Sequence, residues 1–560
     1  MLKKKNRVIT DQVEFVCLSE LVPQDHLLRL VDASINFDFI YDEVKDLYSD
    51  TTGRPSIDPV VLIKLLVLQI LYGITSMRQT ISDAQVNLAY RWFLGYGFQE
   101  KIPHFSTFGK NYERRFKESD LFEKIFERVL FEAIECGFIK ADAVFFDASH
   151  IKANANKNKY VKKMAQHRVH KYKRELMIEI NADRESHGKK PFTDDNDNDS
   201  DGTMIEEKEV KESTTDPESG MFHKGEKERC FAYTATVACE RNNFILGVKT
   251  APGNVHDSQV FTDVFQDVIE KFNDIKAVVA DSGYKTPGVC REIMQANKIP
   301  VMPYKRPMTK EGYFKKYEYV YDEYYDCYIC PNNQVLKYST TNREGYREYK
   351  SNPKICVQCS LRIQCTQSQN FTKVVNRHIW ESYVEYAEDV RHTHQGQDLY
   401  RRRSQTIERV FADAKERHGM RYTRYRGLRK VQHYLTLLFA CMNLKKLAMW
   451  KKKRGMLPPF SRTFPSMLSK FMKLVTINKS RLLAFRPEAG FVYTLRHTFG
   501  VCPLHVTNMK KGGMAVVKST QNSTVAIKQQ KYVTVSGSLA YVTRNYSCKA
   551  SAKNQDLFSW

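Results

Sequence analysis

The sequence lacks the features of an exported or membrane-embedded protein. Its longest apolar stretch, residues 60–74, is interrupted by Lys64 and Gln69 and is too short to span a bilayer. The basic N-terminal segment MLKKKNRVITDQVEF is not followed by the apolar run of a signal peptide. We therefore expect a soluble, cytoplasmic protein that has no membrane partner.

Acidic residues are too few to balance the basic ones. The 560 residues include 88 Lys and Arg against 64 Asp and Glu, which gives a formal net charge of +24. A surplus of this size favours a polyanionic partner, and its spread over many segments favours nucleic acid over a membrane surface. The length is enough for about two to four domains with a sizeable core.

Three acidic residues stand out by their surroundings: Asp147 in VFFDAS, Asp281 in VVADSGY and Glu408 in SQTIERVFADAK. The runs before the two aspartates, residues 143–146 and 275–280, are apolar and too short for helices, which is typical of strands buried on both faces. Taken singly, each acid is equally compatible with a helix cap, a turn or a solvated face. Together, carboxylates at the ends of core strands predict a two-metal site, because hard divalent cations prefer oxygen ligands.

The order of the elements between these acids predicts the fold. Residues 230–239 and 244–251 read as a hairpin, residues 260–272 as an amphipathic helix, and residues 299–304 as a further strand after Asp281. This is the chain order of an RNase H-like core. We therefore expect an α/β fold with a mixed five-stranded sheet and helices. A basic helical stretch at 157–182 and an acidic loop at 191–220 are expected outside the core.

The N-terminal part, residues 1–135, has the pattern of short helices. A late helix that begins near Ser106 carries basic residues on or near one face, which is typical of a helix-turn-helix-like DNA-binding domain. A plain helical bundle with a solvated basic face is equally compatible with the pattern. The basic residues of this helix are Lys110, Arg114 and Arg115.

Five of the 13 cysteines fall in one stretch. Two CxxC pairs resemble the knuckles of a zinc ribbon, in which four thiolates hold a structural Zn²⁺. Disulfides are disfavoured because the chain has no export signal. The predicted ligands are Cys327, Cys330, Cys356 and Cys359, with Cys365 as a spare or substitute.

Several long motifs resemble one known family. They are GRPSIDPVVLIKLLVLQILYGI, LAYRWFLGYGF, FFDASHIKANANK, GNVHDS, ADSGYKTP, IERVFADAKERHGMRYTRYRGL and FACMNLKKLA. Over roughly residues 1–450 the chain resembles the DDE transposases of bacterial insertion sequences, most closely the eleven-eighty-two group. The resemblance implies that Asp147, Asp281 and Glu408 form the catalytic triad.

The resemblance also implies a domain organisation and an activity. We expect a DNA-binding domain at 1–135, a catalytic domain at 136–450 with a cysteine-rich insertion at 310–395, and a C-terminal extension at 451–560 of unknown role. The enzyme is expected to bind the inverted-repeat ends of an insertion sequence, cleave the DNA and join the 3′-hydroxyl ends to target DNA. A metal-dependent nuclease or resolvase without strand transfer, and a non-catalytic DNA-binding protein derived from a transposase, are the alternatives.

The expected chemistry uses two Mg²⁺ ions roughly 4 Å apart, or Mn²⁺, held by the triad. Double-stranded DNA is the expected partner, bound by a homodimer associated with the bacterial nucleoid. In related transposases a tyrosine and an arginine lie seven and four residues before the glutamate, but here Tyr400 and Arg403 are displaced by one position. The candidate DNA contacts are Lys415, Lys152, Asn154, Arg403, Lys110, Arg114, Arg115, Arg424 and Arg426.

Overall fold

The computed structural model describes residues 16–49, 55–168, 173–192, 205–224, 228–306 and 309–457. The chain forms two compact units, Met1–Ser461 and Arg462–Trp560. Most of the expected extension at 451–560 and the centre of the expected acidic loop therefore lie outside the described residues. Among the helices of the described ranges, none combines the length and the apolar character needed to cross a membrane.

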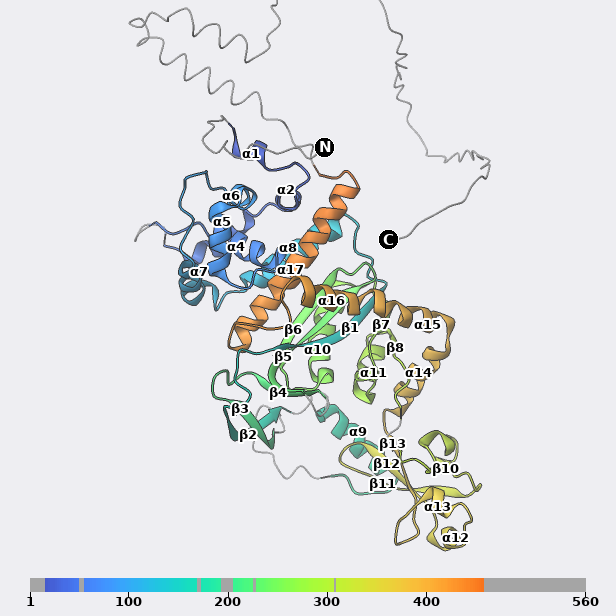
Figure 1. The fold of residues 1–560 in the computed structure, drawn as a ribbon. Helices are drawn as coiled ribbons and strands as arrows, with labels where there is room; N and C mark the ends of the chain where they lie inside the picture. The colour runs from blue at the N-terminus through green and yellow to red at the C-terminus, as the bar shows by residue number, and fades with distance from the viewer. Residues whose placement is uncertain are drawn as a thin grey trace, which may run out of the picture. The chain divides into compact units, whose positions relative to one another are not determined.

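A mixed six-stranded sheet forms the centre of the first unit (Figure 1). The middle strand, β1, pairs antiparallel with β5 on one side and parallel with β7 on the other. Strand β5 also pairs with β4 and β6, and β7 also pairs with β8. The mixed α/β architecture is thus confirmed, and the order β6-β5-β1-β7-β8 agrees with the predicted core. The strands are β1 (Ala143–Lys152), β4 (Gly220–Lys224), β5 (Glu228–Glu240), β6 (Ile245–Pro252), β7 (Ala277–Val279) and β8 (Ile299–Val301).

Helix α10 (Asp257–Lys271) covers one face of this sheet and packs against β5 and β6. Its Phe261 and Phe265 rings lie 4.9 and 6.2 Å from the ring of Phe146 in β1. Because side chains alternate along a strand, Phe146 and Asp147 face opposite sides of the sheet. Helix α11 (Pro287–Gln295) contacts α10 and β8.

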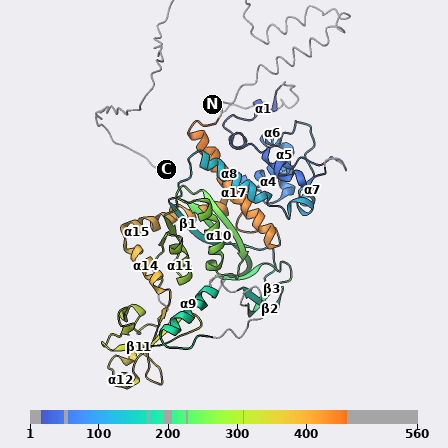
Figure 2. The ribbon, with the colours of Figure 1, turned by 180° about the vertical axis from the view of Figure 1, so that it is seen from behind.

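The N-terminal helices pack around α4, whose side chains are almost all buried, as the apolar run predicts. They join the core through α17 (Leu428–Lys453), which contacts α2, α4 and α8 (Figures 1 and 2). The class of this helical part as a helix-turn-helix stays a prediction. Its elements are α1 (Leu18–Leu21), α2 (Leu27–Asp32), α3 (Phe39–Val44), η1 (Lys45–Leu47), α4 (Pro59–Leu71), α5 (Met77–Val86), α6 (Leu88–Leu94), α7 (Ser106–Asn111), η2 (Tyr112–Phe116) and α8 (Leu121–Glu135).

Helix α17 also covers the exposed edge of β6. The amide of Asn443 accepts from the Ile245 N–H at 2.9 Å and donates to the Ile245 carbonyl at 2.8 Å. Gln432 repeats the arrangement, accepting from the Thr250 N–H at 2.6 Å and donating to the Val248 carbonyl at 3.3 Å. Two side-chain amides therefore satisfy backbone groups that an edge strand leaves open.

The region between β1 and β5 differs from the sequence prediction. Residues expected to be one helix at 157–182 form β2 (Tyr160–Arg168) and α9 (Lys173–Ser186). Part of the expected acidic loop forms β3 (Ile205–Ser213), which pairs antiparallel with β2. Asp216, predicted as loop, is buried because it accepts hydrogen bonds from Tyr233 Oη at 2.8 Å and Gly427 N at 3.0 Å.

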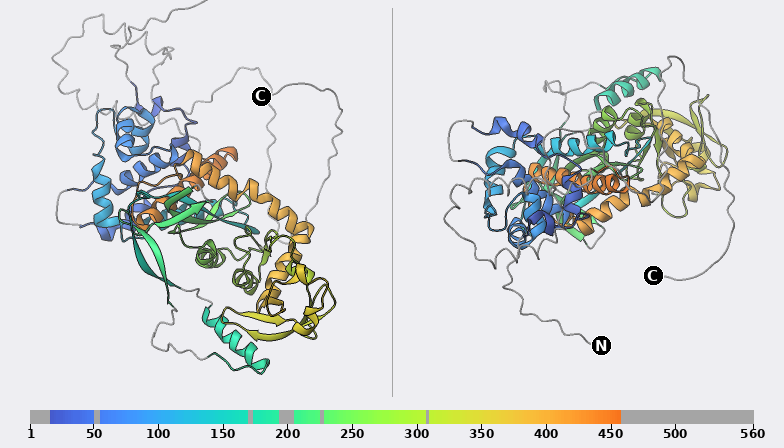
Figure 3. Two further views of the ribbon diagram at one scale, coloured as in Figure 1. Left: turned by 60° about the horizontal axis from the view of Figure 1, so that its bottom comes forward. Right: turned by 90° about the horizontal axis from the view of Figure 1, so that it is seen from above.

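The cysteine-rich segment forms its own antiparallel five-stranded sheet with a small core that includes Tyr328, Leu336 and Tyr349. Helix α9 contacts β11 of this sheet (Figure 3). The elements are η3 (Lys316–Glu318), β9 (Val320–Asp322), β10 (Cys327–Ile329), β11 (Val335–Thr341), β12 (Tyr346–Lys350), α12 (Pro353–Val357), α13 (Arg362–Cys365) and β13 (Val374–His378). The chain then returns through α14 (Glu381–His392), α15 (His394–Arg401), η4 (Arg402–Gln405) and α16 (Ile407–Arg417).

One buried histidine makes the packing of α17 sensitive to pH. His433 stacks on Phe122 at 4.8 Å and pairs through Nδ1 with the Tyr112 hydroxyl at 2.9 Å. Burial, helped by the nearby Arg429, lowers the pKa of His433 to about 4. The unfolded chain therefore takes up this proton first, and stability is lost as the pH falls from about 6.5 towards 4, by about 3 kcal/mol at most.

We predict that His433→Gln removes part of this pH dependence, because glutamine does not titrate. The free energy of unfolding in urea, measured at pH 7 and pH 5, should fall less in the variant than in the wild type. The control is His394→Gln at an exposed position. An equal fall in all three proteins would contradict the assignment.

Candidate active site

The pairing of β1 with β7 places the two aspartates side by side. The strands are parallel, with Phe145 opposite Val279. Asp147 and Asp281 each follow two residues after this pair. Each carboxylate is held by a nearby backbone N–H: Ala148 donates to Asp147 at 2.9 Å and Gly283 donates to Asp281 at 2.8 Å. Both aspartates are half-buried at this edge of the sheet.

Helix α16 carries Glu408 in its first turn. Ile407, Val410, Phe411 and Ala414 form its buried face, and the helix packs against β1 and β5. Its other end is fixed against α4. A Cβ on Gly73 would lie 2.8 Å from the Arg417 carbonyl, and His418 Nδ1 lies 2.9 Å from the Ile70 carbonyl.

The charges of Asp281 and Glu408 both act on Asp147. The pKa of Asp147 is raised to about 6, chiefly by burial and to a smaller extent by the carboxylates of Asp281 and Glu408, whereas Arg403 and the Ala148 N–H act in the opposite direction. Lys415 follows two turns after Glu408 on the same helix.

Arg403 provides the positive charge beside Asp147. Its Nη2 lies 2.8 Å from Asp147 Oδ2. The residue is 6% exposed, and its buried Nε has no hydrogen-bond partner among the described residues. The extra residue between Arg403 and Glu408 is accommodated by the 3₁₀ turn η4 and by Thr406, whose ψ is −101°. The one-residue displacement therefore does not remove Arg403 from the site.

The donor set fits a divalent cation by its chemistry. Three carboxylates supply only oxygen atoms, which are the ligands that hard divalent cations prefer; Asp147 and Asp281 are half-buried, whereas Glu408 is exposed. As the side chains stand, however, no group of three or more His, Cys, Asp or Glu residues in the described ranges is arranged to hold a metal ion. The charge next to Asp147 is balanced by Arg403 instead.

Four of the predicted DNA contacts come together at the end of β1. The segment 421–426, here called the arginine loop, lies against it through hydrogen bonds of Lys152 N to the Arg421 carbonyl at 3.2 Å and of Thr423 N to the Lys152 carbonyl at 2.9 Å. Asn154 adds a bond from Nδ2 to the Arg424 carbonyl at 3.0 Å. The side chains of Lys152, Arg424 and Arg426 are exposed there.

The N-terminal basic residues are less uniform than predicted. Lys110 and Arg114 are exposed, but Arg115 is half-buried. Its Nε donates to the Leu47 carbonyl at 3.1 Å, and its guanidinium lies 4.4 Å from the Tyr48 ring centre. Arg115 thus fixes a turn of the helical part.

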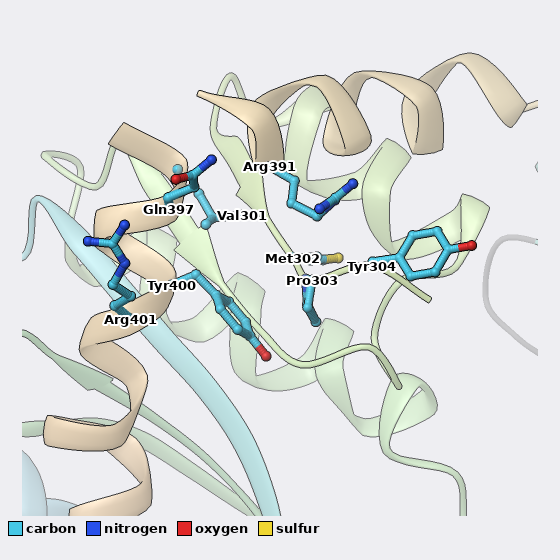
Figure 4. Close-up of a pocket in the computed structure, with 9 residues that line it drawn as sticks. Val301, Met302, Pro303, Tyr304, Arg391, Gln397, Tyr400 and Arg401 are labelled. Atoms are coloured by element: carbon cyan, nitrogen blue, oxygen red, sulfur yellow. The ribbon is translucent and has the colours of Figure 1, made fainter. Parts of the chain in front are cut away.

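A pocket of about 280 Å³ lies beside β8. Figure 4 shows the Tyr400 ring of α15 extending towards the segment 301–304 that follows the strand; Gln397 and Arg401 of the same helix also line the pocket. The Arg391 guanidinium lies 5.5 Å from the Tyr304 ring. Aromatic and basic groups therefore line a hollow close to Arg403, whose own guanidinium is 5.9 Å from the Tyr400 ring.

The predicted zinc ligands do not assemble as expected. Cys327 is buried in β10, and burial together with the charges of Asp322 and Asp326 raises the pKa of its thiol. Burial also raises the pKa of the Cys365 thiol, and Cys356 and Cys330 add to this effect. Cys359 accepts a hydrogen bond from Asn332 at 3.6 Å. Within the described part of the chain these thiols form no metal-holding group, so zinc is not supported. Cys327 lies in a strand of the small sheet, and a zinc site at these cysteines stays a prediction.

Sequence reasoning missed Tyr284, three residues after Asp281. It is only 1% exposed, and its hydroxyl interacts with the side chain of Thr236 in β5. The charges of Asp147 and Asp281 reach it, which together with burial holds the pKa of Tyr284 well above its usual value. A tyrosine in a polar turn directly after an apolar strand was the available signal.

We predict that Arg403→Gln destabilises the metal-free protein by about 3 kcal/mol at pH 8, because it leaves a buried carboxylate without its partner. The loss should be smaller at pH 5, where Asp147 takes up a proton, and Asp147→Asn should recover part of it. Unfolding in urea with a chelator measures these changes. Arg401→Gln is the control, since that side chain is 72% exposed; equal losses in both single variants would disprove a special role of Arg403.

Comparison with known proteins identifies the chain. The family model described as a transposase DDE domain matches residues 329–448, and that of the DUF772 transposase domain matches residues 16–114. No curated protein matches. Among solved structures, the chain is similar to the piggyBac transposase in a synaptic complex with hairpin DNA, at 8% identity over 84% of each chain and a TM-score of 0.31. The mariner transposase Mos1, in a paired-end complex with Mn, gives 9% identity over 48% of this chain and 66% of that one, with a TM-score of 0.14.

On the two family models, the chain belongs to the DDE transposases of insertion-sequence type.

Proposed function

We propose that this transposase cleaves DNA at the inverted-repeat ends of its element and joins the 3′-hydroxyl ends to target DNA by phosphoryl transfer dependent on Mg²⁺ or Mn²⁺. The catalytic carboxylates are Asp147, Asp281 and Glu408. Because two ends must be paired, the acting form is a homodimer on double-stranded DNA.

The observation that carries the proposal is the register of β1 and β7. Phe145 lies opposite Val279, Asp147 follows two residues later within β1, and Asp281 follows two residues later, beyond the end of β7. The charge of Glu408 on α16 also acts on the Asp147 carboxylate. The two aspartates lie between the regions matched by the family models, and Glu408 lies inside the DDE match. The family match thus supports the assignment of Glu408, whereas that of Asp147 and Asp281 is supported by the strand register.

The side chains of the site have distinct tasks in this reaction. Divalent cations, when bound by the three carboxylates, polarise the scissile phosphate and activate the attacking hydroxyl. Asp147 must be ionised to take part, and Arg403 favours that ionised form through its 2.8 Å contact. Lys415, on the helix of Glu408, supplies a second positive charge for the strand.

The arginine loop extends this surface. Its backbone is hydrogen-bonded to Lys152 at the end of β1 and to the side chain of Asn154. The exposed side chains of Lys152, Arg424 and Arg426 therefore lie near the end of the strand that carries Asp147. Contacts of this kind to phosphates position DNA without reading its sequence. Exposed Lys110 and Arg114 are proposed to contact the element's ends.

We predict that Asp147→Asn, Asp281→Asn and Glu408→Gln each lower cleavage of an end-bearing DNA by about 10³-fold or more, since several kcal/mol of transition-state stabilisation are lost. Gel assays with Mg²⁺ should show loss of both cleavage and joining, with DNA binding retained. Asp413→Asn, on the same helix as Glu408, should act like the wild type. Cleavage without joining in the wild type would favour a nuclease, and full activity of Asp281→Asn would reject the triad.

We predict that Arg424→Ala weakens DNA binding equally for specific and unrelated sequences. The slope of log affinity against log salt concentration should fall by about one, because one phosphate contact is lost. Lys354→Ala, an exposed position on α12, is the matched control. Fluorescence anisotropy at several salt concentrations measures the slope, and an unchanged slope in Arg424→Ala would place the DNA elsewhere.

A further inference from the structure

Asp281 lies beyond the paired part of its strand, so the sheet does not hold it directly. The last backbone bond from this strand to its neighbour runs from Ala280 N to the Val301 carbonyl at 3.1 Å. The chain then forms a compact turn at residues 281–286, here called the Asp281 turn, in which Tyr284 N donates to the Asp281 carbonyl at 3.2 Å. The position of the Asp281 carboxylate therefore depends on what anchors this turn.

Lys285 anchors the far end of the Asp281 turn. Its side chain is only 4% exposed, and its Nζ donates to Glu388 Oε2. Its backbone carbonyl accepts a hydrogen bond from Lys305 Nζ at 3.3 Å. Because a buried ammonium group requires an opposite charge, the turn is tied to the position of Glu388.

Glu388 lies on α14 and holds more than one cation. Its Oε1 accepts a hydrogen bond from Arg391 Nε at 2.7 Å and lies 3.5 Å from His392 Nε2. Burial opposes the ionisation of Glu388, but the hydrogen bonds from Arg391 and Lys285 outweigh that effect and lower the pKa of this carboxyl below its usual value. The carboxylate is therefore charged at neutral pH and pairs with both side chains.

Helix α14 connects this ion pair to other residues of the site. It runs beside α11, from the cysteine-rich segment to α15 (Figure 1). The corner between α14 and α15 is tight, since Thr393 Oγ1 accepts from Gly396 N at 3.0 Å and a Cβ on Gly396 would clash with the Val390 carbonyl oxygen. From this corner the chain continues through α15 and η4, which carries Arg403, to Glu408 in α16.

We propose that Glu388 is a positioning residue of the active site. Through Lys285 it fixes the Asp281 turn against the helices α14 to α16. This rests on the proposed function, since it takes Asp281 as a catalytic carboxylate. The two partners are 103 positions apart, with the cysteine-rich segment between them in the sequence, so one ion pair closes the length of chain that contains this segment. The pair sets a distance within the site that strand pairing alone leaves open.

The direct test is hydrogen–deuterium exchange of the full chain without DNA, followed in peptides that cover the Asp281 turn. Glu388→Gln should make the amides of the turn exchange about tenfold faster, because a neutral side chain binds Lys285 more weakly. Lys285→Met removes the same pair without leaving a buried charge on the turn, and should have the same effect. The matched control is Glu385→Gln on the same helix, which breaks the 2.8 Å bond from Arg377 Nη2 to Glu385 Oε2 and should leave the turn unchanged.

Cleavage of an end-bearing DNA at saturating protein is the second measurement. Glu388→Gln and Lys285→Met should each slow single-turnover cleavage by about 10- to 100-fold with DNA affinity unchanged, since small misplacements of reacting groups have effects of this size. The double variant should be no slower than either single variant, because both changes remove one interaction. Glu388→Asp should recover part of the rate, and Glu385→Gln should cleave within about twofold of the wild type.

Three results would overturn the inference. They are a wild-type cleavage rate in Glu388→Gln and Lys285→Met, a slower rate with unchanged exchange of the Asp281 turn, and an equal loss of rate in Glu385→Gln. If the wild type itself cleaves no DNA while both variants exchange faster in the turn, the proposed function is rejected and the anchoring of the turn by Glu388 is confirmed.

Discussion

The parallel pairing of β1 with β7 is the constraint on which the site depends. Both strands are fully buried at Ala143–Phe146 and Ala277–Val279, and the two aspartates follow these stretches, Asp147 within β1 and Asp281 beyond the end of β7. A shift of either strand by one residue would turn its aspartate to the other face, and the apolar core on both faces opposes such a shift. The position of the carboxylates is therefore a consequence of core packing, and the helices contribute their acids to an edge that the sheet has already defined.

Concentrating carboxylates at one edge creates an electrostatic problem that the protein solves internally. Asp147 is shielded from water and faces other negative charges, and Arg403 compensates it from a neighbouring 3₁₀ turn. A guanidinium in this position allows the core to fold before any cation binds. It also explains why the irregular backbone at Thr406 is tolerated, since the turn brings Arg403 to Asp147 while leaving Glu408 at the start of a regular helix.

Much of the core could be predicted from the sequence because its signals are local. The apolar runs that end at Asp147 and Asp281, and the helical spacing after Glu408, each depend on a few neighbouring residues. The errors arose where distant partners decide. The segment Tyr160–Arg168 becomes a strand because β3 pairs with it, and Asp216 is buried where it accepts hydrogen bonds from Tyr233 and Gly427. The contact between Arg403 and Asp147 likewise requires the fold to be known.

The amides of Gln432 and Asn443 occupy the open edge of β6 although they lie almost two hundred residues further along the chain. During synthesis, the sheet therefore emerges from the ribosome long before the helix that covers its edge. Contacts between residues this far apart in the sequence form slowly, and until they form the unpaired edge of β6 can pair with other strands. The catalytic core can mature only when translation has passed α17, which makes the nascent chain inactive, and dependent on protection from aggregation, for most of its synthesis.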